Sequence, residues 1–245
     1  MANKTPTKAE EVLDLDYTKK EDIWLTSQNT LRRLIGIFGL MLPFLLWIFV
    51  FIVSGRTEEL PSISHYYYTR ANGVFIIIIS TLAIFLIIYK GKELLDFYLS
   101  SAAGLFALCL LLFPTSNLYE ACGDLCAPDK RAFATTWIAA HKTREIFHYL
   151  SAAIFLGCLA AMSLFVFTKS DKSKAQRTEK KNWRNRIYIF CGIVMFLAML
   201  VVFPGVLWID EDFYDSHNLT FWMETVAVEF FGASWLVKGK VVLKD

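Results

Sequence analysis

Residues 141–167 read HKTREIFHYLSAAIFLGCLAAMSLFVF, and this stretch decides the fold. It opens with polar side chains and continues as an apolar run of the length that a helix needs to cross a bilayer. His141, Glu145 and His148 are spaced i, i+4 and i+7, so a helix would place them on one side, within roughly 60° of arc. We therefore expect a membrane-spanning helix with a polar site at its start.

The same stretch carries a stripe of small residues. Ala153, Gly157 and Ala161 recur every fourth residue, which is the pattern of close helix packing in membranes. The stripe lies roughly opposite the polar side, so it predicts that this helix is central in a bundle and packs closely at Gly157. The apolar segment at 98–115, which is the third along the chain, also has small residues that predict close helix contact: Ser100, Ala103, Gly104 and Ala107.

Apolar residues gather in six blocks along the chain. The chain is 56% hydrophobic, against about 45–50% in a soluble domain. A helix is the expected form of each block because lipid offers no partner to open backbone groups, and the alternation of a β-barrel is absent. We predict an all-α polytopic membrane protein with six transmembrane helices in one bundle, at residues 34–54, 72–90, 98–115, 144–168, 187–209 and 218–237.

The distribution of basic residues predicts the orientation. The N-terminal segment, the turn KGKELLD, the loop KSDKSKAQRTEKKNWRNR and the C-terminus hold 19 of the 25 Lys and Arg residues. Because basic loops stay on the cytoplasmic side, both termini are expected there, in a cell membrane that would be the cytoplasmic membrane of a bacterium. The first apolar block is expected to be a retained span. The predicted regions are a polar N-terminal tail at 1–30, the transmembrane domain at 31–238 and a C-terminal tail at 239–245, with outward loops at 55–71, 116–143 and 210–217.

Two of the five cysteines fall in the longest outward loop. Cys122 and Cys126, in CGDLC, would face an oxidising compartment, which favours a disulfide between them. Two further soft ligands, which a metal site would need, are not evident nearby.

Hydrogen-bonding side chains are dense in the first outward loop. The segment SISHYYYT at 62–69 contains His65 and Tyr67, which are candidates for lining a ligand pocket. The alternative for the tyrosines is an aromatic belt at headgroup depth.

The last apolar block contains two carboxylates, Glu224 and Glu229. An acidic residue inside a membrane costs about 2.5–3.5 kcal/mol, so such residues face the bundle and have partners. Glu224 should lie at a depth similar to that of His148, and we predict that these two side chains meet directly. Glu229 lies nearer the middle and points about 140° away from Glu224.

The polar start of residues 141–167 has two interpretations. Two histidines and a glutamate could hold zinc with an open coordination position, which would make His141, Glu145 and His148 a metal site. The favoured alternative is a hydrogen-bonded helix start with Glu145 near the positive helix end. We therefore expect no cofactor, with zinc as the alternative.

Several of these segments carry a family resemblance. SISHYYYT, the block SSAAGLFALCLLLFPTS, the E-x-x-H pair of Glu145 and His148, and Glu224 with WLVKG occur in this order. In these features the chain resembles a group of bacterial six-span membrane proteins that is distantly similar to the DRAM and Frag-type membrane proteins. The resemblance covers most of residues 30–240. It implies a six-helix membrane protein with polar groups on the non-cytoplasmic side and no particular reaction.

The function predicted from these observations is binding or sensing of a membrane lipid or small amphiphile in an outward-facing polar pocket. The alternatives are a metal-dependent membrane hydrolase and a proton-coupled transporter that uses Glu229, although an enzyme is the less favoured class. The motifs of nucleotide-binding loops and serine hydrolases are absent. Nucleic acid is not an expected partner, because topology and anionic lipid explain the basic loop at 169–186. The oligomeric state is left open.

Overall fold

The computed structural model describes residues 27–91, 93–118, 134–136, 138–170, 177–203 and 208–243. Within these ranges the chain is helical, and the only β-type pairing is an isolated bridge between Thr69 and Ala134. The helices are α2 (Gln28–Ser54), the 3₁₀ helix η2 (Ile63–Tyr68), α3 (Asn72–Ile88), α4 (Leu94–Leu112), α7 (Lys142–Ala161) with its π-helical continuation η4 (Met162–Val166), α8 (Glu179–Val202), α9 (Glu211–Ser216) and α10 (Leu219–Lys238).

Four of these helices are long and apolar enough to cross a membrane, namely α2, α4, α7 with η4, and α8. Of the other two long helices, α3 is apolar but has 17 residues, and α10 has 20 residues that include Glu224 and Glu229. Large apolar side chains face outward on several helices, such as Ile52, Ile77 and Phe190. A water-soluble surface rarely exposes such continuous apolar area, so the outer surface fits a lipid environment.

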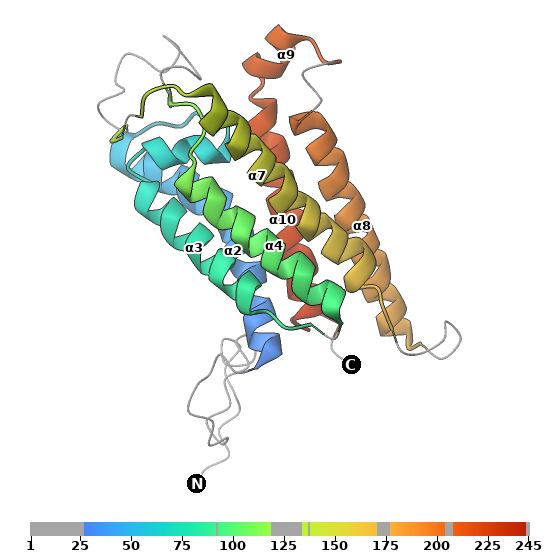
Figure 1. Ribbon diagram of the computed structural model, residues 1–245. Helices are drawn as coiled ribbons and strands as arrows, with labels where there is room; N and C mark the ends of the chain where they lie inside the picture. Colours follow the sequence, from blue (N-terminus) through green and yellow to red (C-terminus); the bar gives the residue numbers. More distant parts are fainter. Residues whose placement is uncertain are drawn as a thin grey trace.

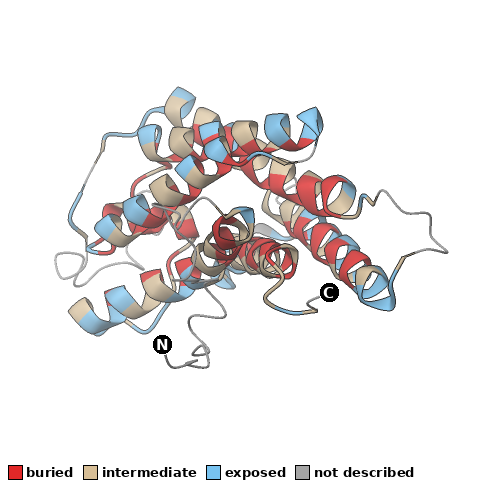
Figure 2. Cartoon of the chain, turned by 90° about the horizontal axis from the view of Figure 1, so that it is seen from below, coloured by how far each residue is buried: buried red, intermediate tan, exposed pale blue. Residues whose placement is uncertain are grey.

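The six long helices form a closed ring. Each packs against the next in the order α2, α3, α4, α7, α8 and α10, and α10 packs against α2 (Figure 1). Seen along the bundle, the buried residues lie on the inner faces of the helices and the exposed residues on the outer faces (Figure 2). The start of α2 and the end of α10 lie at the same end of the bundle (Figure 1). The fourth apolar segment, α7, is therefore one member of the ring and not its centre.

Helices α2 and α10 approach each other closely at small residues of both helices. A Cβ atom on Gly232 would lie 2.8 Å from the carbonyl oxygen of Gly36 and 2.8 Å from the amide nitrogen of Leu40. A similar close contact joins α3 to α4, where a Cβ on Gly104 would lie 2.6 Å from the carbonyl oxygen of Ala83. The small residues of the third apolar segment thus pack closely, as predicted.

The predicted close contact at Gly157 is wrong. A Cβ there would meet only the terminal methyl of Met199, at 3.6 Å, which is an ordinary contact distance. Gly157 faces Met199 of α8, but these two helices approach each other more closely elsewhere, at Gly192, where a Cβ would lie 3.2 Å from the carbonyl oxygen of Ala160. A stripe of small residues permits close packing, but the partner helix must also present a small surface.

Helix boundaries differ from the predicted spans mainly at polar ends. α2 begins six residues early, at Gln28, and Arg33 in its second turn donates to the Gly239 carbonyl over 2.8 Å. α8 begins at Glu179, where the Thr178 side chain accepts a bond from the Lys181 amide. Helices extend beyond the hydrocarbon when capping groups and tertiary contacts satisfy their polar ends. Residues 1–26 of the predicted N-terminal tail and the Cys122–Cys126 disulfide lie outside the described residues, whereas residues 28–30 of that predicted tail form the start of α2.

Candidate functional site

The short helix η2 is hydrogen-bonded to three other elements at the end of the bundle opposite the start of α2. Its Ile63 amide donates to the Glu224 carboxylate of α10 over 2.7 Å, and Ser64 bonds His148 of α7 at 3.0 Å. The Tyr68 hydroxyl donates to the carbonyl oxygen of Thr115, just after α4. Each net bond contributes roughly 1 kcal/mol, so together they hold η2 in one position.

A cavity of about 340 Å³ lies beside η2. Its polar lining includes Ser62 and His65 from η2 and its N-cap, and Glu224 from α10. Its apolar lining includes Ala152 of α7 and Val202 of α8. The volume falls in the lower part of the range for small-molecule sites, about 300–1,000 Å³. The cavity therefore has the size and the mixed lining for a small amphipathic ligand.

Glu224 is half-buried on the wall of this cavity. One carboxylate oxygen, Oε2, accepts the bond from the Ile63 amide. The other oxygen, Oε1, has no hydrogen-bond partner among the described residues. A carboxylate oxygen in such a position can accept a hydrogen bond from a hydroxyl or ammonium group of a ligand.

His65 is buried and bonded through both ring nitrogens. Its Nδ1 lies 2.7 Å from the Ser62 hydroxyl, and its Nε2 lies 3.4 Å from the Ser116 hydroxyl. Burial, together with a smaller effect of the neighbouring His148, lowers the pKa of His65 to about 3. The imidazole is consequently neutral at physiological pH, where it can both donate and accept one hydrogen bond.

The predicted direct contact between His148 and Glu224 is wrong. His148 bonds the Phe113 carbonyl at 2.8 Å and the Ser64 hydroxyl, while Glu224 bonds the Ile63 amide, so no hydrogen bond or ion pair joins the two side chains. Each was correctly expected to need a polar partner. The partners are consecutive residues of η2, which connects the two side chains indirectly.

The predicted polar triplet at the start of α7 does not come together. The helix begins at Lys142, and His141 is an exposed N-cap residue with extended backbone, so it does not share the helical face of His148. Glu145 accepts a bond from the His141 amide at 3.3 Å and pairs with Arg144 at 3.5 Å. These contacts fit the helix-start interpretation of Glu145. In the described part of the chain, no three His, Cys, Asp or Glu side chains form a possible metal site.

Two other candidates lie away from the cavity lining. Tyr67 packs its ring edge-on against Tyr68 and Phe75, with centroid distances of 5.4 Å and 6.4 Å. Glu229 is half-buried further along α10 and has no hydrogen bond or ion pair with any described residue. Of the sequence candidates, the structure thus brings His65 and Glu224 to one cavity. His148 does not line this cavity, but it bonds Ser64 of η2.

Sequence reasoning missed the residues that complete this cavity. Thr115 and Thr220 line it, and Ser116 bonds His65. Single hydroxyl residues at the ends of apolar segments are common. Nothing in the spacing of these residues marks them as neighbours of the loop that contains His65, which lies far from them in the sequence. Comparisons of the chain with protein-family models, with curated proteins and with solved structures found no match. The resemblance to bacterial six-span proteins therefore stays a prediction.

Proposed function

We propose that this chain is a six-span membrane protein that binds a lipid or small amphiphile in the outer cavity, defined as the cavity lined by Ser62, His65 and Glu224. In this proposal α3 and α10 also cross the membrane, and both termini are cytoplasmic. The Lys and Arg distribution supports the orientation. The closed ring supports six spans, because α3 and α10 pack alongside the four longer apolar helices.

The observation that carries the proposal is the free carboxylate oxygen of Glu224 inside a cavity with an apolar side. An intramembrane carboxylate is costly unless it serves a partner. Here one oxygen stabilises η2, and the second is left for a ligand. A ligand whose headgroup donates hydrogen bonds matches this oxygen. Its apolar part would lie against Ala152 and Val202.

The ligand would enter from the lipid or the interface. Tyr149, which lines the cavity, is 47% exposed, so the lining reaches the outer surface of the ring at α7. No observation favours the alternatives to the same degree. The residues of the zinc hypothesis lie apart, and Glu229 does not line the outer cavity.

The experiment compares three amphiphiles of equal chain length: octylamine, octyl glucoside and octanoate. Purified protein, held in a detergent with a longer chain, is melted in the presence of each. We expect octylamine or octyl glucoside to raise the melting temperature and octanoate to leave it unchanged, because only the first two donate to Glu224. A ligand at 100 times its Kd stabilises by about 2.7 kcal/mol.

Two variants localise the effect. Glu224→Gln should abolish the stabilisation by octylamine, since its amide no longer attracts an ammonium group. Glu229→Gln removes a carboxylate from the same helix outside the outer cavity and should leave the stabilisation intact. Equal stabilisation by all three amphiphiles, or equal loss in both variants, would contradict binding at Glu224.

A further inference from the structure

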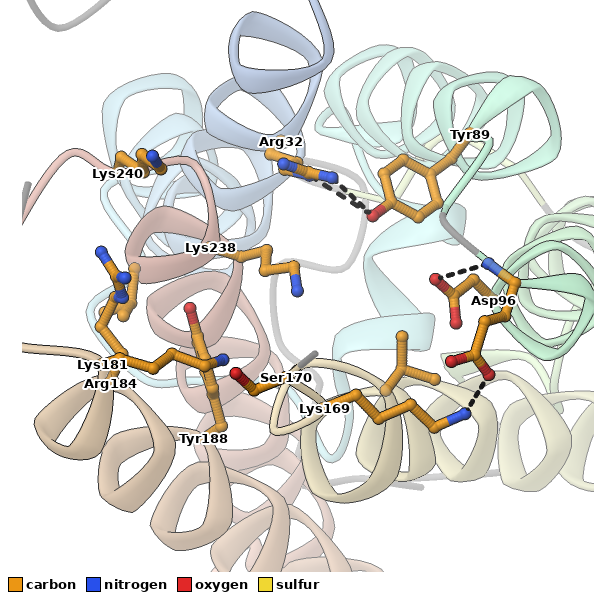
Figure 3. Close-up of a pocket in the computed structure, with 13 residues that line it drawn as sticks. Arg32, Tyr89, Asp96, Lys169, Ser170, Lys181, Arg184, Tyr188, Lys238 and Lys240 are labelled. Atoms are coloured by element: carbon orange, nitrogen blue, oxygen red, sulfur yellow. Dashed lines mark hydrogen bonds and ion pairs between the residues drawn. The ribbon is translucent and has the colours of Figure 1, made fainter. Parts of the chain in front are cut away.

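A second cavity lies at the other end of the ring, near the start of α2 and the end of α10. Its volume is about 330 Å³, and it shares no lining residue with the outer cavity. The lining comes from both halves of the chain, from Arg32 near the start of α2 to Lys240 just after α10 (Figure 3). We call it the basic cavity, because six of its described lining residues are cationic: Arg32, Lys169, Lys181, Arg184, Lys238 and Lys240.

Acidic residues of the basic cavity are fewer and lie along one side. Glu93 and Asp96, at the start of α4, are the two carboxylates among the described lining residues. Glu93 pairs with Lys169, and the Glu93 and Asp96 pair also forms the capping box of α4. These acids have structural partners near the helix start, whereas the cations surround the opening (Figure 3). The lining as a whole therefore favours an anion.

Hydrogen bonds and an aromatic contact hold several of these cations in position. The Lys181 ammonium donates to the Phe167 carbonyl at 3.2 Å, and the Arg184 guanidinium donates to the Leu243 carbonyl at 2.9 Å. The Lys238 ammonium lies 4.8 Å from the ring centroid of Phe167, and its side chain extends into the opening (Figure 3). Cations held in place before binding lose less conformational entropy when an anion arrives.

One lining residue of the basic cavity, Tyr89, belongs to a buried aromatic cluster. Trp235 is fully buried and packs edge-on against Tyr89 at 5.0 Å and Phe167 at 5.2 Å between ring centroids. Two cations of the lining contact this cluster, since the Arg32 guanidinium lies 5.6 Å from the Tyr89 ring centroid and the Lys238 ammonium contacts the Phe167 ring. Charges beside buried apolar groups interact more strongly with an anion than charges in open water.

We propose that the basic cavity binds a phosphate monoester, either as the headgroup of an anionic lipid or as a soluble phosphate ester. A phosphate monoester carries about −1.5 to −2 charges and three acceptor oxygens, which suits a ring of Lys and Arg donors. Basic pockets between membrane helices at the cytoplasmic surface are positioned to receive lipid headgroups. The site is independent of the outer cavity, since the two lie at opposite ends of the ring.

The test uses full-length protein in a neutral detergent and four probes. These are phosphatidic acid with two eight-carbon chains, phosphatidylcholine with the same chains, glycerol 3-phosphate and inorganic phosphate. We expect phosphatidic acid to bind at least about tenfold more tightly than phosphatidylcholine in native mass spectrometry, because only the former presents a monoester. If glycerol 3-phosphate or inorganic phosphate binds as tightly as phosphatidic acid, the ligand is a soluble phosphate; if neither does, the ligand is a lipid.

A matched pair of double variants places the binding. The K181Q/K238Q variant removes two charges from the basic cavity and should weaken phosphatidic acid binding about tenfold or more. The K180Q/R186Q variant removes two charges from exposed positions on α8, outside the lining, and should bind like the parent. Equal affinity for phosphatidic acid and phosphatidylcholine, or an equal loss in both double variants, would overturn the proposal.

A second measurement needs no variant. Bound phosphatidic acid should slow the chemical acylation of Lys181 and Lys238 in the parent protein, as read by mass spectrometry of peptides. Lys142 is exposed at the far end of the bundle and serves as the internal control. Unchanged acylation of Lys181 and Lys238 at saturating phosphatidic acid would overturn the proposal even if K181Q/K238Q fails to fold.

Discussion

Folding lowers the pKa of His65, so this side chain is neutral in the folded protein over a pH range in which it is charged in the unfolded chain. Burial and the nearby His148 lower its pKa to about 3, from an ordinary value of about 6.5. Between these two pH values the unfolded chain binds a proton that the folded chain does not. Acidification through this range therefore reduces the free energy of unfolding, and this contribution is fully present only above the unfolded pKa. The two serine bonds to its ring stabilise the neutral form that the folded state requires.

Replacement of His65 tests this linkage. His65→Gln keeps a neutral side chain that can bond Ser62 but removes the group that titrates. We expect the parent protein to lose melting temperature between about pH 7 and about pH 4, and the variant to lose less over the same range. A melting series in detergent at several pH values measures the difference. Parallel pH profiles would show that His65 is not the group responsible.

At the scale of the single side chain, the sequence correctly predicted which residues require a polar partner, but it predicted the wrong partner for them. His148 and Glu224 were each expected to find a polar partner, because neither tolerates lipid. Their partners are Ser64 and the backbone amide of Ile63, in a six-residue 3₁₀ helix. No sequence pattern marked those backbone groups as donors. Buried polar residues can therefore be recognised from sequence more readily than the groups that satisfy them.

At the scale of the helix, α10 connects the structural and functional parts of the molecule. Its Glu224 lies at the outer cavity, its Gly232 lies against Gly36 of α2, and its Lys238 lies at the basic cavity. Ser234 of the same helix bonds Ser163 of η4 at 2.8 Å in the buried interior. A displacement of α10 would thus alter both cavities and the ring that separates them.

Two matched glycine substitutions test where helix packing is close. Gly232→Ala places a Cβ against backbone atoms of α2 that cannot move cheaply, and overpacking of this kind costs about 1–3 kcal/mol. Gly157→Ala meets only the flexible end of Met199 and gains helix propensity, so it should be neutral or stabilising by up to about 1 kcal/mol. Thermal melting of both variants distinguishes them. A larger loss at Gly157 would place the close contact at α7.

The sequence predicted close packing at two stripes of small residues, and the structure shows it at only one of them. The stripe around Gly104 on α4 and the stripe around Gly157 on α7 look alike as sequences. Gly104 meets a backbone carbonyl of α3, whereas Gly157 meets the side chain of Met199. The difference lies in the partner helix, which the spacing of one segment does not contain. For the same reason, the close approach of Gly36 and Gly232 was not predicted.

At the scale of the whole molecule, the two ends of the ring have different chemistry. One end carries the outer cavity, with a carboxylate and a neutral histidine, and the other carries the basic cavity. The sequence predicted the basic character of the second end from the loops. It did not predict a cavity there, because residues such as Lys238 have the same sequence signature whether they face water or line a pocket. The proposed functions of the two cavities both depend on which end faces the cytoplasm.

The most direct test of the account is accessibility of single cysteines in intact cells. Position 58 has an exposed side chain in the loop at 55–71, which we propose faces outward, and position 175 lies in the basic loop at 169–186; the variants are Glu58→Cys and Ala175→Cys. A thiol reagent that does not cross membranes is applied before and after permeabilisation, with the parent protein as the background for its own cysteines. If both termini are cytoplasmic, as we propose, position 58 is labelled in intact cells and position 175 is labelled only after permeabilisation. Labelling of position 175 in intact cells would contradict the proposed orientation and place the basic cavity outside the cell.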